Sequence, residues 1–221
     1  MKFLLMDYEG CLFPIIEKHP KIGIIYKEAK RRFISEVSGV EKDNVSDLLK
    51  RLRIKYKTDA TPYILNREYK VEIDSYIENV YKPVLSIAKK LVKKDDKLKE
   101  RLEEIDYDKA VLSNTPRYII EHLAKLQGIR DQLSFIMGLE DIMPTPKPYK
   151  DAYKKAYEEI KKSLNRRINK KDVIYFEDNV ENIRSAGRFG FTTVLIGDTR
   201  SKCGDFRFKD IYKALSYFFE D

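Results

Sequence analysis

The sequence predicts an α/β protein in which a doubly wound parallel sheet is interrupted by an inserted α-helical domain. Two observations lead to this prediction. Short apolar runs followed by segments of helical periodicity occupy both ends of the 221-residue chain. Between Gly39 and Gly128 there is no glycine, and apolar residues recur there at spacings of three and four.

The strands of the predicted sheet are short and apolar, at residues 2–6, 110–112, 135–137, 173–176 and 192–196. Predicted helices alternate with the later strands, at residues 117–126, 149–163, 180–189 and 209–219. This alternation is typical of parallel strands joined by crossover helices. The two ends of the chain are therefore expected to form one α/β domain, which the helical segment interrupts just after the first strand.

The inserted segment, residues 14–105, is expected to fold as a small bundle of about four helices. Its first apolar stripe consists of Tyr26, Ala29, Phe33 and Val37, and similar stripes follow as far as residue 105. A helix with one apolar face must bury that face against neighbours. The helices of this segment are accordingly expected to pack against one another.

Composition excludes several classes of protein. With 43% hydrophobic residues the chain can build a core, so it is not a disordered tail. Cys11 and Cys203 lie far apart with no CxxC motif, which argues against a disulfide framework or a thiolate zinc site and fits a reducing cytoplasm. No apolar run approaches the roughly 20 residues of a membrane span, and the apolar run at residues 1–6 reaches Asp7 too early to be the h-region of a signal peptide. We expect a cytoplasmic protein without a membrane partner.

Two carboxylates, Asp7 and Glu9, follow the first strand. Ligands of open α/β sheets bind at the carboxyl ends of the strands. Alternate residues of an extended chain face the same way, so both carboxylates could converge on one site. Such a pair requires a cation, a proton or a matching substrate. A polar loop after a strand explains the pair equally well.

The second predicted strand runs into Ser113-Asn114-Thr115-Pro116. Thr115 suits a helix N-cap and Pro116 the first helical position. Hydroxyl and amide side chains beside the free N–H groups of a helix start make an anion site. Capping alone would also explain the motif.

A single lysine, Lys147, lies in the proline-rich segment 144–148. Most lysines are solvated surface residues. Prolines on both sides restrict the backbone, however, and this favours a fixed positive charge at Lys147.

Another acidic segment, Glu177-Asp178-Asn179, follows the strand at 173–176, and Asn182 lies on the next helix. Asp178 and Asn179 both suit an N-cap, which is the simplest explanation. Yet acids, a hydroxyl, a lysine and further acids follow successive strands in that order. A magnesium phosphotransferase on this fold requires that set: a nucleophile, a proton shuttle, oxyanion donors, a cation for the phosphate and carboxylates for the metal.

The sequence resembles the haloacid dehalogenase superfamily of phosphohydrolases over nearly its whole length. The motifs that carry the resemblance are Asp7-Tyr8-Glu9-Gly10-Cys11-Leu12, Leu112-Ser113-Asn114-Thr115, Lys147-Pro148 and Phe176-Glu177-Asp178-Asn179. The resemblance implies a Rossmann-like core formed by residues 1–13 and 106–221, with a helical cap, residues 14–105, inserted after the first motif. Cys11-Leu12-Phe13 and the run at 178–183 are most similar to the pyrimidine 5′-nucleotidase group.

This resemblance implies a role for each motif in a phosphatase of small phosphorylated metabolites, with nucleoside 5′-monophosphates as one substrate class. Asp7 would be the nucleophile that forms an aspartyl-phosphate, and Glu9 the acid/base. Ser113 and the N–H of Asn114 would hold phosphate oxygens. Lys147 would neutralise the charge shared by nucleophile and phosphate.

The cofactor implied by the resemblance is Mg²⁺, held by Asp7, the carbonyl of Glu9 and Asp178. A hard, octahedral ion suits a site with few carboxylates. Glu177 and Asn182 fall where the family has supporting residues around the metal.

One departure from the family is Glu9, because its phosphatases normally carry aspartate there. The extra methylene moves the carboxyl group, and positioning is central to acid/base catalysis. An altered active phosphatase, a slow one and a catalytically weakened scaffold are the three possible outcomes. A haloacid dehalogenase is the alternative within the fold, although it needs no metal. Phosphonate hydrolysis would need a Schiff-base lysine from the cap.

The net charge of +8 raises a different class, a nucleic-acid-binding protein. Basic and acidic residues are interleaved, as in the segment 93–101, which is typical of a solvated helix face. No nucleic-acid-binding motif is present. Most of the excess lies in residues 14–105, with 22 Lys and Arg against 16 Asp and Glu. A basic lid that attracts small phosphate esters explains this distribution better than a nucleic-acid partner, and the oligomeric state stays open.

Overall fold

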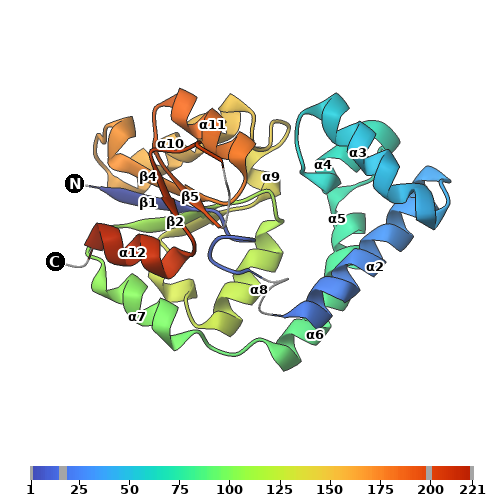
Figure 1. The fold of residues 1–221 in the computed structure, drawn as a ribbon, viewed down its shortest axis with the longest axis horizontal. Helices are drawn as coiled ribbons and strands as arrows, with labels where there is room; N and C mark the ends of the chain where they lie inside the picture. Colours follow the sequence, from blue (N-terminus) through green and yellow to red (C-terminus); the bar gives the residue numbers. More distant parts are fainter. Residues whose placement is uncertain (1, 15–18, 198–200, 220–221) are drawn as a thin grey trace. The chain divides into compact units, whose positions relative to one another are not determined.

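The computed structural model describes residues 2–14, 19–197 and 201–219 (Figure 1). Contacts divide the chain into two units: Met1–Pro14 with Lys93–Asp221, and Ile15–Val92. Each unit is described by itself.

The larger unit is built on a six-stranded sheet in the order β3-β2-β1-β4-β5-β6, and every neighbouring pair is parallel. The strands are β1 (Phe3–Met6), β2 (Lys109–Leu112), β3 (Phe135–Met137), β4 (Val173–Glu177), β5 (Thr192–Ile196) and β6 (Phe206–Phe208). The first five confirm the strands predicted from the sequence. At β1 the chain order reverses between β2 and β4, and such a switch point is where open α/β sheets bind ligands.

Helices cover both faces of this sheet, which confirms the doubly wound α/β fold. They are α7 (Asp96–Glu104), α8 (Arg117–Gln127), α9 (Leu139–Ile142), α10 (Lys150–Leu164), α11 (Val180–Phe189) and α12 (Ile211–Phe219). In Figure 1, α10 and α11 lie on one side of the strands, and α7 and α12 lie on the other.

The central strands are buried because both faces of the sheet are covered. All four residues of β1 have no exposed surface, and all five residues of β4 are buried. Continuous apolar strands are what a parallel sheet between two helical layers requires. Glu177 is the exception at the end of β4, a fully buried carboxylate, and such a group must be paired or hydrogen-bonded.

The smaller unit is helical throughout its regular structure, as the spacing of its apolar residues predicts. It contains α2 (Pro20–Ser38), α3 (Val45–Tyr56), α4 (Thr61–Tyr69), α5 (Ile73–Tyr76), a π-helical turn (Ile77–Tyr81) and α6 (Lys82–Leu91). Helix α2 packs against the π-helical turn and α6. Within this core, Phe33 meets Tyr76 edge to face, with ring centroids 5.8 Å apart.

Helix α7 belongs to the larger unit in the structure, although the sequence boundary assigns residues 93–105 to the cap. Tyr212 of α12 donates a hydrogen bond to the carboxylate of Asp95 (2.6 Å), and the Asp95 N–H donates to the carbonyl of Gln127 (2.9 Å). Leu98 of α7 is buried, and α7 packs on α12. Its apolar spacing resembles that of the cap helices, so only tertiary contacts separate it from them.

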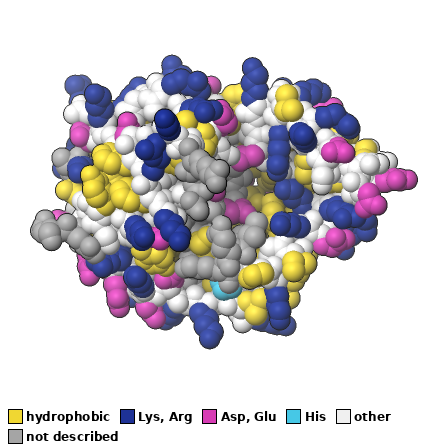
Figure 2. All heavy atoms as spheres, viewed as in Figure 1, with side chains coloured by type: hydrophobic (Ala, Val, Ile, Leu, Met, Phe, Trp, Pro, Cys, Tyr) yellow, Lys and Arg dark blue, Asp and Glu magenta, His cyan; other side chains and the backbone are white. Residues whose placement is uncertain are grey.

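Surface charge is dispersed on the face drawn in Figure 2, where acidic side chains lie among the lysines and arginines. Ion pairs such as Lys161–Glu158 and Lys99–Glu103 join residues three or four positions apart on one helix. Of the helices that the structure describes, none has the length and apolar content needed to cross a membrane.

Candidate active site

The candidate site lies where β1, β2 and β4 end. Asp7 follows β1 directly, and its N–H donates to the carbonyl of Phe176 on β4 (2.8 Å). Only 6% of Asp7 is exposed. The Nζ atom of Lys147 lies 2.9 Å from Oδ1 of Asp7, so two residues separated by most of the chain form an ion pair inside the protein.

Lys147 is held as an interior cation and is 1% exposed. Its Nζ donates to the carbonyl of Leu112 (3.0 Å), the hydroxyl of Tyr175 (3.0 Å) and Oε2 of Glu177 (2.7 Å). Burial disfavours the charged amine, but Asp7 and Glu177 outweigh that effect and raise the pKa of Lys147 above its usual value. Lys147 therefore keeps its charge and, unlike most lysines, is buried.

Glu177 is fully buried and fully hydrogen-bonded. Its Oε2 accepts from Lys147, from Tyr175 (2.6 Å) and from the side chain of Asn182 (3.0 Å). Its Oε1 accepts from the N–H groups of Asp178 (3.2 Å) and Asn179 (3.0 Å). Burial raises the pKa of Glu177, but Lys147 and these hydrogen bonds lower it to about 2. Glu177 is thus a permanent anion that anchors Lys147.

Asp178 and Asp7 are the acids whose pKa values are raised in the site, and Lys147 balances the charge of Asp7 only in part. Oxygens of Asp7, Glu177 and Asp178 all lie within 4.8 Å of one another. Burial and repulsion from Glu177 raise the pKa of Asp7 to about 7, against the opposing effects of Lys147 and Ser113. Desolvation of its carboxylate, with repulsion from Glu177 and Asp7, raises the pKa of Asp178 to about 9. A cation at this position would stabilise both ionised carboxylates.

The donor set fits a hard divalent cation such as Mg²⁺. Glu177 uses both oxygens for hydrogen bonds within the protein, which leaves the carboxylates of Asp7 and Asp178 as the candidate ligands. The family resemblance also implies the carbonyl of Glu9 as a metal ligand. These are oxygen donors, and Mg²⁺ is bound by one or two carboxylates and keeps positions for water and phosphate.

The loop after β1 is closed tightly around Gly10. Gly10 has a φ of +86°, and a Cβ atom there would lie 2.1 Å from Oδ2 of Asp178. Only glycine combines this backbone conformation with such a close approach. The loop is anchored by a hydrogen bond from the Phe13 N–H to the Tyr8 carbonyl (2.8 Å), and the Tyr8 hydroxyl donates to Oε1 of Gln127 (2.6 Å).

The candidate phosphate-binding residues follow β2. Ser113 is 2% exposed, and its N–H donates to the carbonyl of Met137 on β3 (3.0 Å). Asn114 bonds through its side chain to both main-chain polar groups of Lys147. The phosphate-binding role that the family resemblance implies for Asn114 involves its main-chain N–H, and the side-chain contact with Lys147 is separate from it.

Thr115 does not cap a helix, and that prediction is wrong. Helix α8 begins at Arg117, and Pro116 occupies the N-cap position with extended backbone (φ −56°, ψ 136°). The hydroxyl of Thr115 instead donates to Oε2 of Glu9 (3.2 Å). By contrast, Asn179 does cap α11: its Oδ1 accepts from the N–H of Glu181 (2.9 Å).

Comparison with known proteins identifies the family. A model described as haloacid dehalogenase-like hydrolase matches residues 16–196. The chain belongs to the haloacid dehalogenase-like hydrolase family. No protein among those with curated functions matches the sequence.

Solved structures with the haloacid dehalogenase fold cover essentially the whole chain. A phosphatase of this family from Thermococcus onnurineus has a TM-score of 0.64 and 16% identity, covering 99% of this chain and 98% of its own. The family hydrolase YfnB from Bacillus subtilis, bound to magnesium, has a TM-score of 0.64 and 13% identity, covering 100% and 99%. The L-2-haloacid dehalogenase from Xanthobacter autotrophicus has a TM-score of 0.60 and 13% identity, covering 99% and 98%. At these identities the likeness shows the fold alone.

Two residues of this haloacid dehalogenase-like site escaped the sequence analysis. Tyr175 bridges Lys147 and Glu177, and Thr115 contacts Glu9. Tyr175 could have been found, because it lies two residues before Glu177 on a strand and so faces the same side of the sheet. Nothing local in the sequence indicates the contact of Thr115, which depends on how two loops meet.

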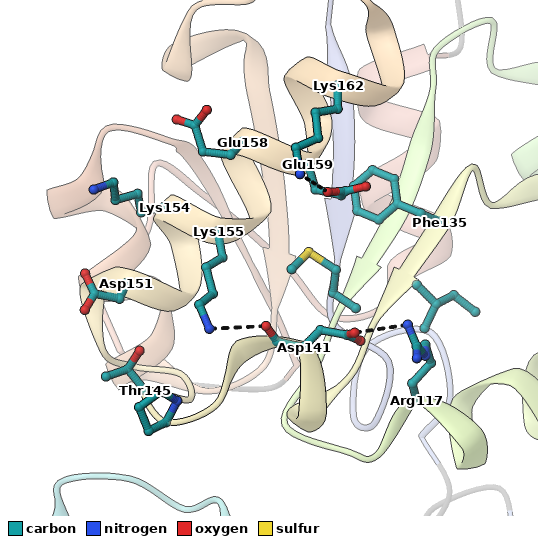
Figure 3. Close-up of a pocket in the computed structure, with 13 residues that line it drawn as sticks. Arg117, Phe135, Asp141, Thr145, Asp151, Lys154, Lys155, Glu158, Glu159 and Lys162 are labelled. Carbon is teal, nitrogen blue, oxygen red and sulfur yellow. Dashed lines mark hydrogen bonds and ion pairs between the residues drawn. The ribbon is translucent and has the colours of Figure 1, made fainter.

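A separate groove lies beside the edge strand β3 and contains none of the predicted site residues (Figure 3). Apolar residues such as Phe135 and Met137 line it, and charged residues of α10 surround it. Two of the charged groups bond within the groove: Arg117 pairs with the carboxylate of Asp141 (3.0 Å), and Lys155 donates to the Asp141 carbonyl (3.3 Å). The acids and the lysine at the ends of β1, β2 and β4 therefore form the better candidate for catalysis.

Proposed function

We propose that the protein is a Mg²⁺-dependent phosphatase that hydrolyses small phosphomonoesters through an aspartyl-phosphate on Asp7. The observation that carries the proposal is the buried Asp7–Lys147–Glu177 arrangement beside Asp178. It combines a carboxylate nucleophile, a permanent cation and an uncompensated acid at one strand edge.

Asp7 would attack the phosphorus atom of the ester. The new bond joins a carboxylate oxygen to phosphorus, and the bond from phosphorus to the leaving oxygen breaks. Lys147 would favour the ionised form of the Asp7 carboxylate and attract the phosphate, because the ion pair with Glu177 keeps Lys147 charged. The hydroxyl of Ser113, which is buried beside Asp7, and the N–H of Asn114 would donate hydrogen bonds to the phosphate oxygens.

Glu9 would move the protons in both halves of the reaction. In the first half its carboxyl proton passes to the leaving oxygen, which departs as an alcohol. In the second half the Glu9 carboxylate takes a proton from water, whose oxygen attacks phosphorus. Asp7 is then released as a carboxylate together with inorganic phosphate.

Mg²⁺ would be held by Asp7, Asp178 and the carbonyl of Glu9. When bound, it supplies positive charge between the nucleophile and the phosphate. Dehalogenation requires no metal, so a pair of acids that a cation would stabilise favours phosphate-ester hydrolysis over dehalogenation.

We propose that the substrates are small phosphorylated metabolites, including nucleoside 5′-monophosphates, and that the protein is located in the cytoplasm. The resemblance of the segments at 11–13 and 178–183 to pyrimidine 5′-nucleotidases supports the proposed substrate class. The cysteines Cys11 and Cys203 are free, which supports the proposed cytoplasmic location.

A panel of phosphate esters tests the proposal. UMP, dUMP, CMP, AMP, sugar phosphates and an aryl phosphate would be assayed with Mg²⁺ and with a chelator. We expect Mg²⁺-dependent release of phosphate that Asp7→Asn abolishes and that the exposed variant Asp151→Asn leaves unchanged. Turnover that survives either chelation or Asp7→Asn would contradict the proposal.

A further inference from the structure

We propose that Thr115 is a positioning residue that fixes the carboxylate of Glu9 for proton transfer. This inference rests on the proposed phosphatase function and explains how glutamate can serve where aspartate is usual. The observation behind it is the hydrogen bond from Oγ1 of Thr115 to Oε2 of Glu9, at 3.2 Å.

Thr115 is itself immobilised. It is 6% exposed, and both of its main-chain polar groups are bonded. Its N–H donates to Oγ of Ser113 (3.3 Å), and its carbonyl accepts from the N–H of Leu139 (3.2 Å). Because the β-branched side chain has few rotamers, the hydroxyl has a defined position relative to the ends of β2 and β3.

Glu9 needs such a partner more than an aspartate would. Its backbone is fixed by the bridge to Phe13 and by the neighbouring bond from the Gly10 N–H to the Phe13 carbonyl (3.2 Å). The side chain has one more rotatable bond than aspartate, so its carboxylate samples more positions. A hydrogen bond to one carboxylate oxygen selects a single arrangement and orients the second oxygen as well.

The contact also connects the candidate phosphate-binding segment after β2 with the candidate acid/base, Glu9. Ser113 and Thr115 lie on the same short segment after β2, with Ser113 assigned to the phosphate and Thr115 bonded to the acid/base. One rigid segment therefore sets the distance between the phosphate and the proton donor. Displacing a catalytic group by about 1 Å can cost about 100-fold in rate.

The test compares Thr115→Val, which keeps the shape but removes the hydroxyl, with Thr115→Ser, which keeps the hydroxyl. We expect Thr115→Val to lower kcat by about 10-fold to 100-fold with KM changed by less than about threefold, because proton transfer and not binding is impaired. Thr115→Ser should recover most of the rate. The loss should be larger for an alkyl phosphate than for an aryl phosphate, whose leaving oxygen needs less protonation.

The same pair is then compared in a Glu9→Asp background. The shorter aspartate cannot reach the Thr115 hydroxyl, so Thr115→Val should lower kcat there by less than about twofold. This double-mutant cycle isolates the contact from any general effect of the substitution. Equal losses in both backgrounds would show a merely structural role and overturn the inference, as would full activity of Thr115→Val in the native background.

Thermal unfolding confirms that the variants are folded before kcat is compared. Should Thr115→Val fail to fold, Thr115→Ala and Thr115→Ser decide the question by the same cycle. The inference and the proposed function fail in different ways. A native protein without Mg²⁺-dependent turnover refutes the function, whereas an active native protein with no coupling between Thr115 and Glu9 refutes only the positioning role.

Discussion

The side chain of Asn114 holds Lys147 by both of its main-chain polar groups. Nδ2 of Asn114 donates to the Lys147 carbonyl (3.0 Å), and the Lys147 N–H donates to Oδ1 of Asn114 (2.9 Å). The segment after β2 and the proline-flanked loop are thereby joined at the residue whose amine reaches Asp7. The position of the Lys147 ammonium group therefore depends on the Asn114 side-chain amide, although these two hydrogen bonds join that amide to the main chain of Lys147.

Replacing Asn114 by alanine should both lower the stability of the protein and lower its kcat. Two main-chain groups of Lys147 lose their partner, which costs about 1–3 kcal/mol, and Tm falls by about 2–4 °C per kcal/mol in a chain of this size. Because Lys147 is then less well placed, kcat should also fall. Thermal unfolding and steady-state kinetics measure both effects. The exposed variant Asn169→Ala serves as control, and equal behaviour of the two variants would contradict the prediction.

Lys147→Met should destabilise the fold strongly. It leaves Glu177 buried without a counter-charge, and breaking a buried ion pair on one side costs about 3–5 kcal/mol. Urea unfolding measures the change, with the exposed Lys154→Met as control.

The double variant Lys147→Met, Glu177→Gln separates stability from catalysis. Removing the uncompensated charge should recover a large part of the lost stability, while activity stays absent because the cation is gone. If Lys147→Met alone left the free energy of unfolding unchanged, the Lys147–Glu177 ion pair would not stabilise the fold as predicted.

Without divalent cations, stability should fall as pH rises from about 4 to about 9. The pKa values of Asp7 and Asp178, about 7 and about 9, lie above their ordinary 3.8. The folded protein therefore binds these protons more tightly than the unfolded chain, and that advantage disappears as pH passes through the raised values. Glu177, with its pKa lowered from 4.5 to about 2, acts oppositely, but only below about pH 4.5.

Added Mg²⁺ should reverse this loss. It binds the ionised carboxylates, so the increase in Tm should be larger at about pH 9 than at about pH 5. Thermal unfolding with Mg²⁺ and with a chelator at both pH values measures it. An equal shift at both pH values would count against Asp7 and Asp178 as the ligands.

Asp178→Asn should raise Tm in the absence of metal at alkaline pH, because it removes repulsion from Glu177 and Asp7. It should also abolish Mg²⁺-dependent turnover. Stability gained with activity lost is the usual signature of a residue kept for function. A lower Tm for this variant at alkaline pH would show that the Asp178 charge stabilises the metal-free fold instead.

Gly10→Ala should weaken Mg²⁺ binding. The new methyl group would occupy the position of the Asp178 carboxylate, so the Mg²⁺ concentration for half-maximal activity should rise about 10-fold to 100-fold. Gly39→Ala is the matched control, because Gly39 also has positive φ (+70°) but no atom within 4 Å of a Cβ. The control should lose stability through backbone strain and keep its Mg²⁺ dependence. If both variants kept the same Mg²⁺ dependence, Asp178 would not be the ligand that Gly10 makes room for.

Part of the site could be read from the sequence because parallel strands end at a common edge. Asp7, Ser113 and Glu177 each follow or end a strand of the sheet, so the order of strands brings them together. β6 was not predicted, because its three residues include a charged arginine and lie at the edge of the sheet. Its apolar signal is too short to separate from the surrounding loop.

The spacing of apolar residues and the order of chemical groups at strand ends determined the α/β class, the helical insert and the candidate catalytic set. These follow from local periodicity and from the geometry of parallel sheets. Only the tertiary structure decided that α7 groups with the sheet, that Glu177 and not solvent balances Lys147, and that Thr115 turns toward Glu9. The reason is physical: the partner of a buried polar group is set by segments that meet in space, and nothing in the neighbouring sequence records which segments those are.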